Sequence, residues 1–259
     1  MTTTTDNFAQ EKIMTTPFIP YSDIIALDRD LHRDLAYHAM LFDFSFAAAL
    51  NVVPLLAQEL PLAAHHYPIV FLQDNGAAMP VALVGIGDNC NRYVNADGSW
   101  SRDTYIPAWI RRYPFVTFRA EGKDEIAVGV DNAFSWANKA DGEALFDADC
   151  KPTERLQASL NYCAEFENAV TATRAFAEAV RDAGLLQDSN LRIERPNAAP
   201  HQIDGFAIVR EADLAALPDA TVLDFNRRGY LGLIHAHLMS HGSTRQLAGV
   251  GTNEQAGNN

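Results

Sequence analysis

The stretch Y-P-I-V-F-L-Q-D-N-G-A-A-M-P-V-A-L-V-G-I, residues 67–86, holds two dense apolar runs on either side of an Asn-Gly pair. Asn-Gly is the strongest short-range signal of a hairpin turn, because both residues tolerate the positive φ that a two-residue turn needs. The run from Tyr67 to Leu72 and the run from Pro80 to Ile86 are therefore predicted to be antiparallel neighbours in a sheet.

Further short strands are predicted on both sides of this hairpin. Phe42, Phe44 and Phe46 alternate with polar residues, as in a strand with one buried face. The other predicted strands are an edge strand within 18–27, a strand at 91–95, and a pair at 115–119 and 126–130. Strands spaced about ten residues apart with turn residues between them indicate an antiparallel meander or a strongly curved sheet, and not a βαβ architecture.

The second half of the chain has a different pattern. Thr153 is placed to cap a helix whose apolar stripe runs on to Gly184, where a terminal glycine is expected. Beyond it the sequence predicts strands at 191–193 and 206–209 that flank a loop at 195–205, a short helix at 211–217, and a last helix from Asp219 to about Leu247. The predicted fold class is α+β, with an antiparallel β-rich first half packed by the long amphipathic helix and a C-terminal helix. Residues 1–16 are predicted to be a disordered arm, 17–248 a single domain and 249–259 a disordered tail.

Composition excludes several classes of function. The chain has 33 acidic and 20 basic side chains and a formal net charge of -13, so it should repel nucleic acid and anionic membrane surfaces. It contains neither an apolar run of roughly 20 residues, as a membrane span needs, nor the start of a secretory signal. The three cysteines, Cys90, Cys150 and Cys163, have no CxxC spacing, which argues against a disulfide framework or a structural zinc site. We expect a cytoplasmic protein without a cofactor.

The stretch from Gly98 to Phe115, G-S-W-S-R-D-T-Y-I-P-A-W-I-R-R-Y-P-F, is the candidate binding segment, because aromatic rings and guanidinium groups bind ligands and partners strongly per residue. Its predicted contact residues are Tyr105, Trp109, Arg111, Arg112 and Tyr113. The alternative interpretation is that the aromatic residues pack a core while the arginines pair with acids. If the binding interpretation is right, one arginine must point inward, and an inward arginine needs a partner.

Histidines supply the candidate metal ligands. His32-Arg33-Asp34 matches H-x-D, and with His237 it would make the two-histidine, one-carboxylate face of non-haem iron oxygenases. His237 and His241 lie four residues apart on the predicted last helix, but the glutamate of an H-E-x-x-H motif is missing. Core histidines and a solvated charged segment explain the same residues without a metal.

Taken together, several motifs resemble the bacterial SapC family from about Ile25 to Leu247. They are D-F-S-F-A-A-A-L-N-V-V-P-L, Y-P-I-V-F, P-V-A-L-V-G-I, N-R-Y-V-N-A-D-G-S-W, G-E-A-L-F-D, L-G-L-I-H-A-H-L-M-S and, most distinctive, Y-I-P-A-W-I-R-R-Y-P-F. The resemblance implies no established reaction. It implies a link to surface layers and to neighbours such as TonB-dependent receptors, flavin-dependent halogenase-like proteins and cupin-like proteins.

Three hypotheses about function follow. The first is a non-catalytic cytoplasmic accessory or binding protein of a bacterial surface or TonB-linked nutrient-uptake system, whose partner is a protein or a small molecule. The alternative is a metal-dependent enzyme, such as a non-haem iron oxygenase, that uses His32, Asp34 and His237. The third is a homo-oligomer formed through the last helix, with Leu238 on its contact face.

Overall fold

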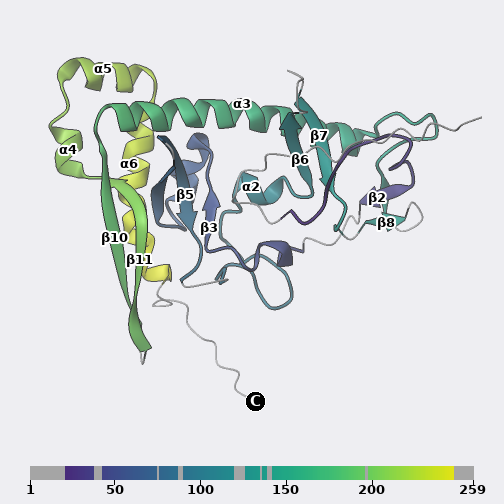
Figure 1. Ribbon diagram of the computed structural model, residues 1–259, viewed down its shortest axis with the longest axis horizontal. Coiled ribbons are helices and arrows are strands. Elements are labelled where there is room, and N and C mark those ends of the chain that lie inside the picture. Colours follow the sequence, from purple (N-terminus) through teal and green to yellow (C-terminus); the bar gives the residue numbers. More distant parts are fainter. Residues whose placement is uncertain are drawn as a thin grey trace, which may run out of the picture. The chain divides into compact units, whose positions relative to one another are not determined.

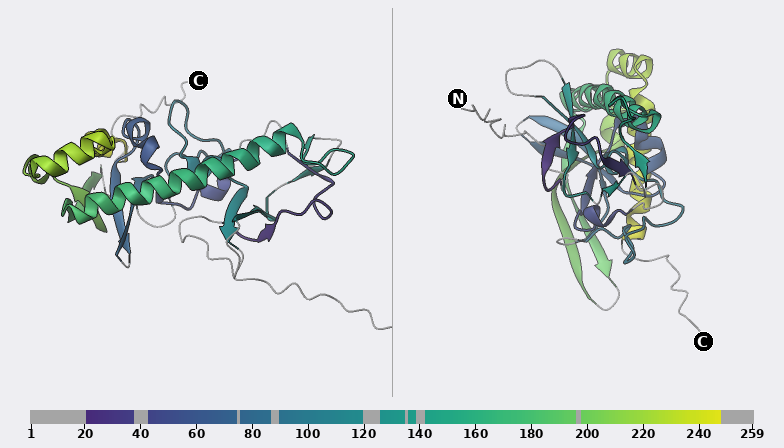
Figure 2. Two further views of the ribbon diagram at one scale, coloured as in Figure 1. Left: turned by 90° about the horizontal axis from the view of Figure 1, so that it is seen from above. Right: turned by 90° about the vertical axis from the view of Figure 1, so that its right-hand side faces the viewer.

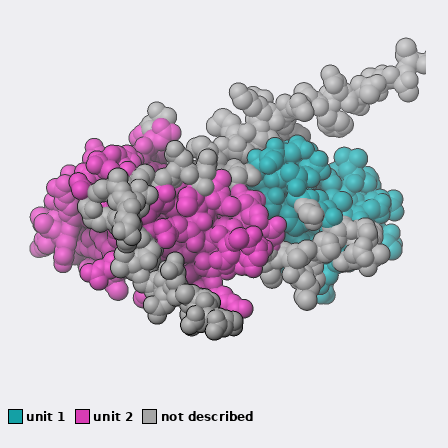
Figure 3. All heavy atoms as spheres, turned by 90° about the horizontal axis from the view of Figure 1, so that it is seen from below, with its two compact units in different colours: residues 1–39, 112–163 teal, residues 40–111, 164–259 magenta. Residues whose placement is uncertain are grey.

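A computed structural model describes residues 21–37, 43–74, 76–86, 90–119, 126–134, 136–138, 142–195 and 198–247. The chain forms two compact units, each assembled from two separate segments (Figure 3). Unit 1 comprises residues 1–39 and 112–163, and unit 2 comprises residues 40–111 and 164–259. The predicted arm and tail lie outside the described residues. The single domain at 17–248 stays a prediction.

Unit 2 contains a five-stranded antiparallel sheet with the strand order β10-β11-β4-β5-β3. Its strands are β3 (Val52–Pro54), β4 (Ile69–Asp74), β5 (Ala77–Leu83), β10 (Leu186–Arg195) and β11 (Ala198–Val209). The predicted hairpin is confirmed, because β4 and β5 pair from Ile69 with Ala82 to Asp74 with Ala77, and Gly76 has the expected positive φ of 80°.

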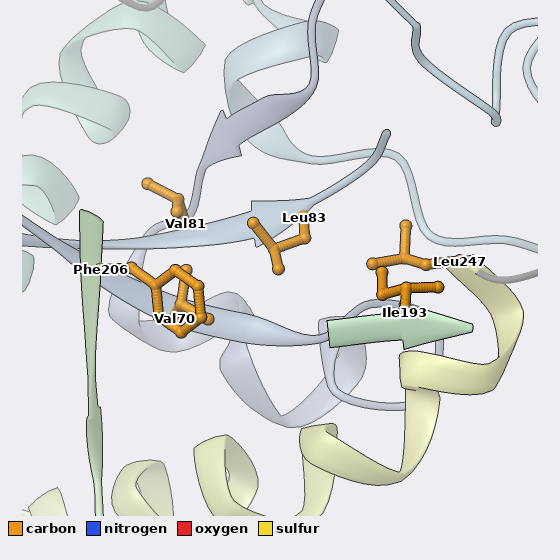
Figure 4. Close-up of a cluster of buried hydrophobic side chains, with 6 residues drawn as sticks. All are labelled: Val70, Val81, Leu83, Ile193, Phe206 and Leu247. Atoms are coloured by element: carbon orange, nitrogen blue, oxygen red, sulfur yellow. The ribbon is translucent and has the colours of Figure 1, made fainter. Parts of the chain in front are cut away.

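Apolar side chains from this sheet form one core of unit 2. Val70, Val81 and Leu83 of the hairpin meet Phe206 of β11 and Ile193 of β10 in a buried cluster. Figure 4 shows Leu247, from the last helical turn, lying beside Ile193 at the edge of this cluster. Residues far apart in the sequence therefore close the same core.

The β10–β11 hairpin is longer than predicted. The prediction of a loop at 195–205 is wrong, because β11 begins at Ala198 and Arg195 pairs with Ala198. Register shifts between Ser189 and Leu191 and between Ile193 and Arg195 let the ladder continue past irregular residues.

The helices of unit 2 are short, apart from its share of α3. They are η2 (Ala57–Glu59), α1 (Leu60–Ala63), α2 (Ala108–Arg111), α4 (Glu211–Ala215), α5 (Asp219–Arg227), α6 (Tyr230–Ser240), η3 (His241–Ser243) and α7 (Thr244–Leu247), with η1 (Ser45–Ala47) near the start. In Figure 1, α6 runs beside the β10–β11 hairpin.

The prediction of one last helix from Asp219 to Leu247 is wrong. Gly229 adopts a left-handed conformation with φ of 74° and separates α5 from α6. On α6, Leu238 is half-buried and Met239 is 67% exposed. A homo-oligomer through this helix stays a prediction.

Two other predicted strands are wrong. Residues 45–47 form the 3-10 helix η1, because the Asp43 carboxylate accepts the Ser45 amide and turns the backbone. Residues 91–95 form turns with one isolated bridge from Val94 to Trp100, and the Asn91 side chain bonds to the Ala47 carbonyl and the Tyr93 amide. In both segments, polar side chains bond to backbone groups that would otherwise pair with a neighbouring strand.

Unit 1 has two three-stranded antiparallel sheets. One has the order β1-β7-β6 and the other β8-β2-β9. The strands are β1 (Ile24–Ala26), β2 (Leu35–Tyr37), β6 (Phe115–Arg119), β7 (Ile126–Asp131), β8 (Ala137–Asn138) and β9 (Glu143–Ala144). The predicted pair β6–β7 and the edge position of β1 are confirmed. A buried cluster that includes Phe115, Val130, Leu145 and Leu156 forms the core.

The predicted long helix is confirmed as α3 (Glu154–Asp182), which is unbroken in Figures 1 and 2. The Leu156 amide donates to the Thr153 hydroxyl at 3.4 Å, and Gly184 has φ of 73° just after the helix. Residues 154–163 belong to unit 1 and the rest to unit 2. The α+β fold class is therefore confirmed. None of the helices in the described ranges combines the length and the apolar character that a membrane crossing requires.

Candidate functional site

Glu59, at the end of η2, holds the middle of the candidate binding segment in place. Its side chain is 3% exposed, and Oε1 accepts the Tyr105 hydroxyl and the Ala108 amide, both at 2.7 Å. Oε2 accepts the Leu56 amide at 2.8 Å. One buried carboxylate thus joins η2 to the first turn of α2, where the amides of a helix are otherwise unpaired.

Arg111 extends this cluster toward solvent. Its Nε donates to the Ile106 carbonyl at 2.9 Å, and one Nη donates to the Tyr105 hydroxyl at 3.2 Å and lies 3.7 Å from Glu59. The guanidinium carbon lies 5.7 Å from the centre of the Tyr105 ring. The Arg111 side chain is still 44% exposed. We call Glu59, Tyr105 and Arg111 the acid-anchored cluster.

Burial controls the ionisation of the cluster. It raises the pKa of Glu59, and the bonds from Tyr105, Leu56 and Ala108 together with the Arg111 charge oppose this shift. Burial and the neighbouring Glu59 also raise the pKa of Tyr105. Tyr105 therefore stays protonated near neutral pH, and its hydroxyl donates a hydrogen bond to Glu59. The cluster is a charge-assisted hydrogen-bond network that joins Tyr105 and Arg111 of the candidate binding segment to Glu59 of η2.

The two tryptophans of the segment lie in the interior of unit 2. Trp109 is 4% exposed and packs edge-on against Phe166, with ring centres 5.0 Å apart. Trp100 is 6% exposed and donates its ring N–H to the Tyr67 hydroxyl at 3.3 Å. The Tyr67 hydroxyl in turn donates to the Tyr105 carbonyl. Trp100 is thus linked through the Tyr67 hydroxyl to the backbone of the segment at Tyr105.

Arg112 and Tyr113 belong to unit 1, whereas the residues of the acid-anchored cluster belong to unit 2. Arg112 is 4% exposed and donates to the Thr117 hydroxyl at 3.2 Å. It lies beside Tyr21, and burial raises the pKa of Tyr21 to about 12 although the Arg112 charge opposes this. Tyr113 is partly exposed and packs on Phe134 with ring centres 5.6 Å apart. Arg112 is therefore the inward arginine, and it has a partner.

The candidate iron ligands fall in different units. His32 and Asp34 lie in unit 1, where the buried His32 ring accepts the Asp28 amide on Nδ1 at 2.8 Å and Asp34 is exposed. His237 lies in unit 2, and its Nε2 accepts the Val209 amide at 3.0 Å. Within the described ranges, no three His, Cys, Asp or Glu side chains gather as a metal-ligand group.

Glu59 is a site residue that the sequence did not indicate. Its carboxylate accepts the Tyr105 hydroxyl and the Ala108 amide, which lie 46 and 49 residues further along the chain. No motif or spacing relates positions that far apart. The sequence therefore indicated the segment and gave no signal for the acid that anchors it.

Comparisons with known proteins give one match. The family model described as SapC matches residues 27–247, which is most of the chain. No curated protein and no solved structure matches it.

Proposed function

The chain belongs to the SapC family, and we propose that it is a non-catalytic cytoplasmic accessory or binding protein of a bacterial surface or TonB-linked nutrient-uptake system. Its partner is a protein or a small-molecule ligand. The observation that carries the proposal is the ordered, partly exposed Arg111 of the acid-anchored cluster.

An ordered arginine suits recognition for an energetic reason. A long, mobile side chain loses rotamer freedom when it is fixed in an interface, at a cost of about 0.5–1.5 kcal/mol. Arg111 is already held by the Ile106 carbonyl and the Tyr105 hydroxyl, so that cost falls largely on folding instead of binding. Arginine and tyrosine are also enriched among the residues that dominate binding energy.

The roles of the five predicted residues divide accordingly. Tyr105, Arg111 and Tyr113 keep exposed surface and are proposed as direct contacts. Trp109 and Arg112 are buried and are proposed to hold the segment in its binding conformation. The contacts of Glu59 support binding over catalysis, because its oxygens are occupied by Tyr105 and two backbone amides of its own fold.

The test is a quantitative pull-down from the native cell with tagged full-length protein. The variant Arg111→Glu reverses the exposed charge, and Arg174→Glu makes the same change at an exposed position in the middle of α3. We expect the first variant to reduce capture of the specific partner about tenfold or more. The second should capture it like the unmodified protein.

Equal capture by the unmodified protein and Arg111→Glu would contradict the role of the acid-anchored cluster. If a small molecule is the partner, native mass spectrometry of protein purified from the same cells replaces the pull-down. The Arg111→Glu variant should then retain less ligand than the unmodified protein, and the Arg174→Glu variant should retain as much.

A further inference from the structure

His237 joins the C-terminal helices to the sheet of unit 2. It lies on α6, is fully buried, and its Nε2 accepts the backbone N–H of Val209 at 3.0 Å. Val209 is the last residue of β11. Ser240 supports the same attachment, since its hydroxyl accepts the Ile69 amide of β4 at 2.9 Å, while Ser243 joins η3 to the end of α1 by donating to the Ala64 carbonyl at 2.9 Å.

The bond to Val209 fixes the position of the proton on this ring. An imidazole nitrogen that accepts a hydrogen bond carries no proton, so the neutral His237 ring must be protonated on Nδ1. That Nδ1 is buried and has no hydrogen-bond partner within the described ranges. A second proton must therefore enter at Nε2. Two N–H groups would then face each other, and the bond to β11 would be lost.

The backbone of Ile69 favours a charged His237 ring, but burial and the neighbouring His241 outweigh it. The ring packs edge-on against Phe71 and His241, with ring centres 5.1 and 4.8 Å away. The Nε2 of His241 is also buried and lacks a partner within the described ranges. The other acidic and basic side chains described on the strands and helices packed against α6 are exposed; they are Asp74, Asp204, Asp219, Asp224 and Arg227. Burial and the neighbouring His241 lower the pKa of His237 to about 3.

We propose that protonation of His237 releases helices α6 and α7 from the five-stranded sheet, which makes the C-terminal attachment of this fold an acid-sensitive latch. In the released segment the ring regains its ordinary pKa of 6.5. The released state then binds a proton that the latched state excludes. Release is therefore promoted as the pH falls below 6.5 and is unaffected above it. This inference is independent of the proposed binding function.

Hydrogen exchange of the full-length protein tests the latch. From about pH 7.5 to pH 5, the linkage predicts that the protection factors of the Val209 amide and the α6 amides fall about 30-fold relative to Val81 at the centre of the sheet. The variant His237→Gln retains an oxygen acceptor that does not titrate, so its relative protection should change less than about threefold. His235→Gln changes an exposed histidine of the same helix and should behave like the unmodified protein.

Three outcomes would overturn the proposal. They are an unchanged relative protection in the unmodified protein, an undiminished pH dependence in His237→Gln, and an equal loss of protection at Val81, which would mean global unfolding instead of local release. If His237→Gln fails to fold, NMR titration of the unmodified protein decides. A His237 ring that titrates near its ordinary pKa while the Val209 amide stays protected would rule the latch out.

Discussion

Replacing Gly85 with alanine is expected to lower the free energy of unfolding by about 3 kcal/mol, because no space exists for a side chain at this position. A Cβ built there would lie 1.5 Å from the Cys90 carbonyl oxygen and 3.3 Å from the Asn51 Cα. Both are backbone atoms that cannot rotate away. Gly85 also donates its amide to the Asn51 carbonyl at 3.1 Å, so moving the backbone would break a hydrogen bond.

Urea unfolding followed by circular dichroism measures this effect. The matched control is Gly232→Ala on α6, where a Cβ would meet nothing within 4 Å. Alanine is favoured over glycine inside a helix, so this control should raise the free energy of unfolding by about 0.5–1 kcal/mol. An unchanged urea midpoint for Gly85→Ala would mean that the close approach of Gly85 to Cys90 does not constrain the fold.

Replacing Glu59 with alanine is expected to lower the free energy of unfolding by about 3 kcal/mol, since it leaves several buried donors without an acceptor. The donors are the amides of Leu56 and Ala108 and the hydroxyl of Tyr105. Glu59→Gln should cost less than half as much, because an amide oxygen replaces part of the acceptor set and no charge is buried.

Thermal and urea unfolding measure the free energy of unfolding of these variants, and a control variant shows how much of the loss comes from removing any carboxylate. Glu165→Ala removes an exposed carboxylate from α3 and should change the free energy of unfolding by no more than about 0.5 kcal/mol. Equal losses for the alanine variants at positions 59 and 165 would show that the acid-anchored cluster does not stabilise unit 2.

Local signals in the sequence predicted much of the fold. The Asn-Gly pair predicted the β4–β5 hairpin, and the apolar stripe between Thr153 and Gly184 predicted α3. The break at Gly229 also had a local signal, since glycine commonly ends a helix, but it was not used. The failure at Phe44 has a different cause: period-two alternation was present, while the Asp43 side chain turned the backbone into a 3-10 helix.

The candidate site was predictable only in part. The mixture of aromatic and arginine residues identified the segment, but the sequence did not distinguish exposed members from buried ones. Arg111 and Arg112 are neighbours in the sequence, yet the Arg111 side chain is 44% exposed and Arg112 is 4% exposed. The Glu59 carboxylate that lies beside Arg111 and accepts the Tyr105 hydroxyl comes 46 residues before Tyr105, so no local pattern indicates it.

The strand order of unit 2 has a consequence for how the protein is synthesised. β4 pairs with β5 immediately along the chain, but its other neighbour, β11, follows about 120 residues later. At ribosomal speeds the nascent chain exposes that edge of β4 for on the order of ten seconds before its partner strand is made. An unpaired strand edge that carries the fully buried Phe71 is prone to aggregation. We therefore expect nascent chains stalled before Ala198 to bind chaperones, and completed chains to release them.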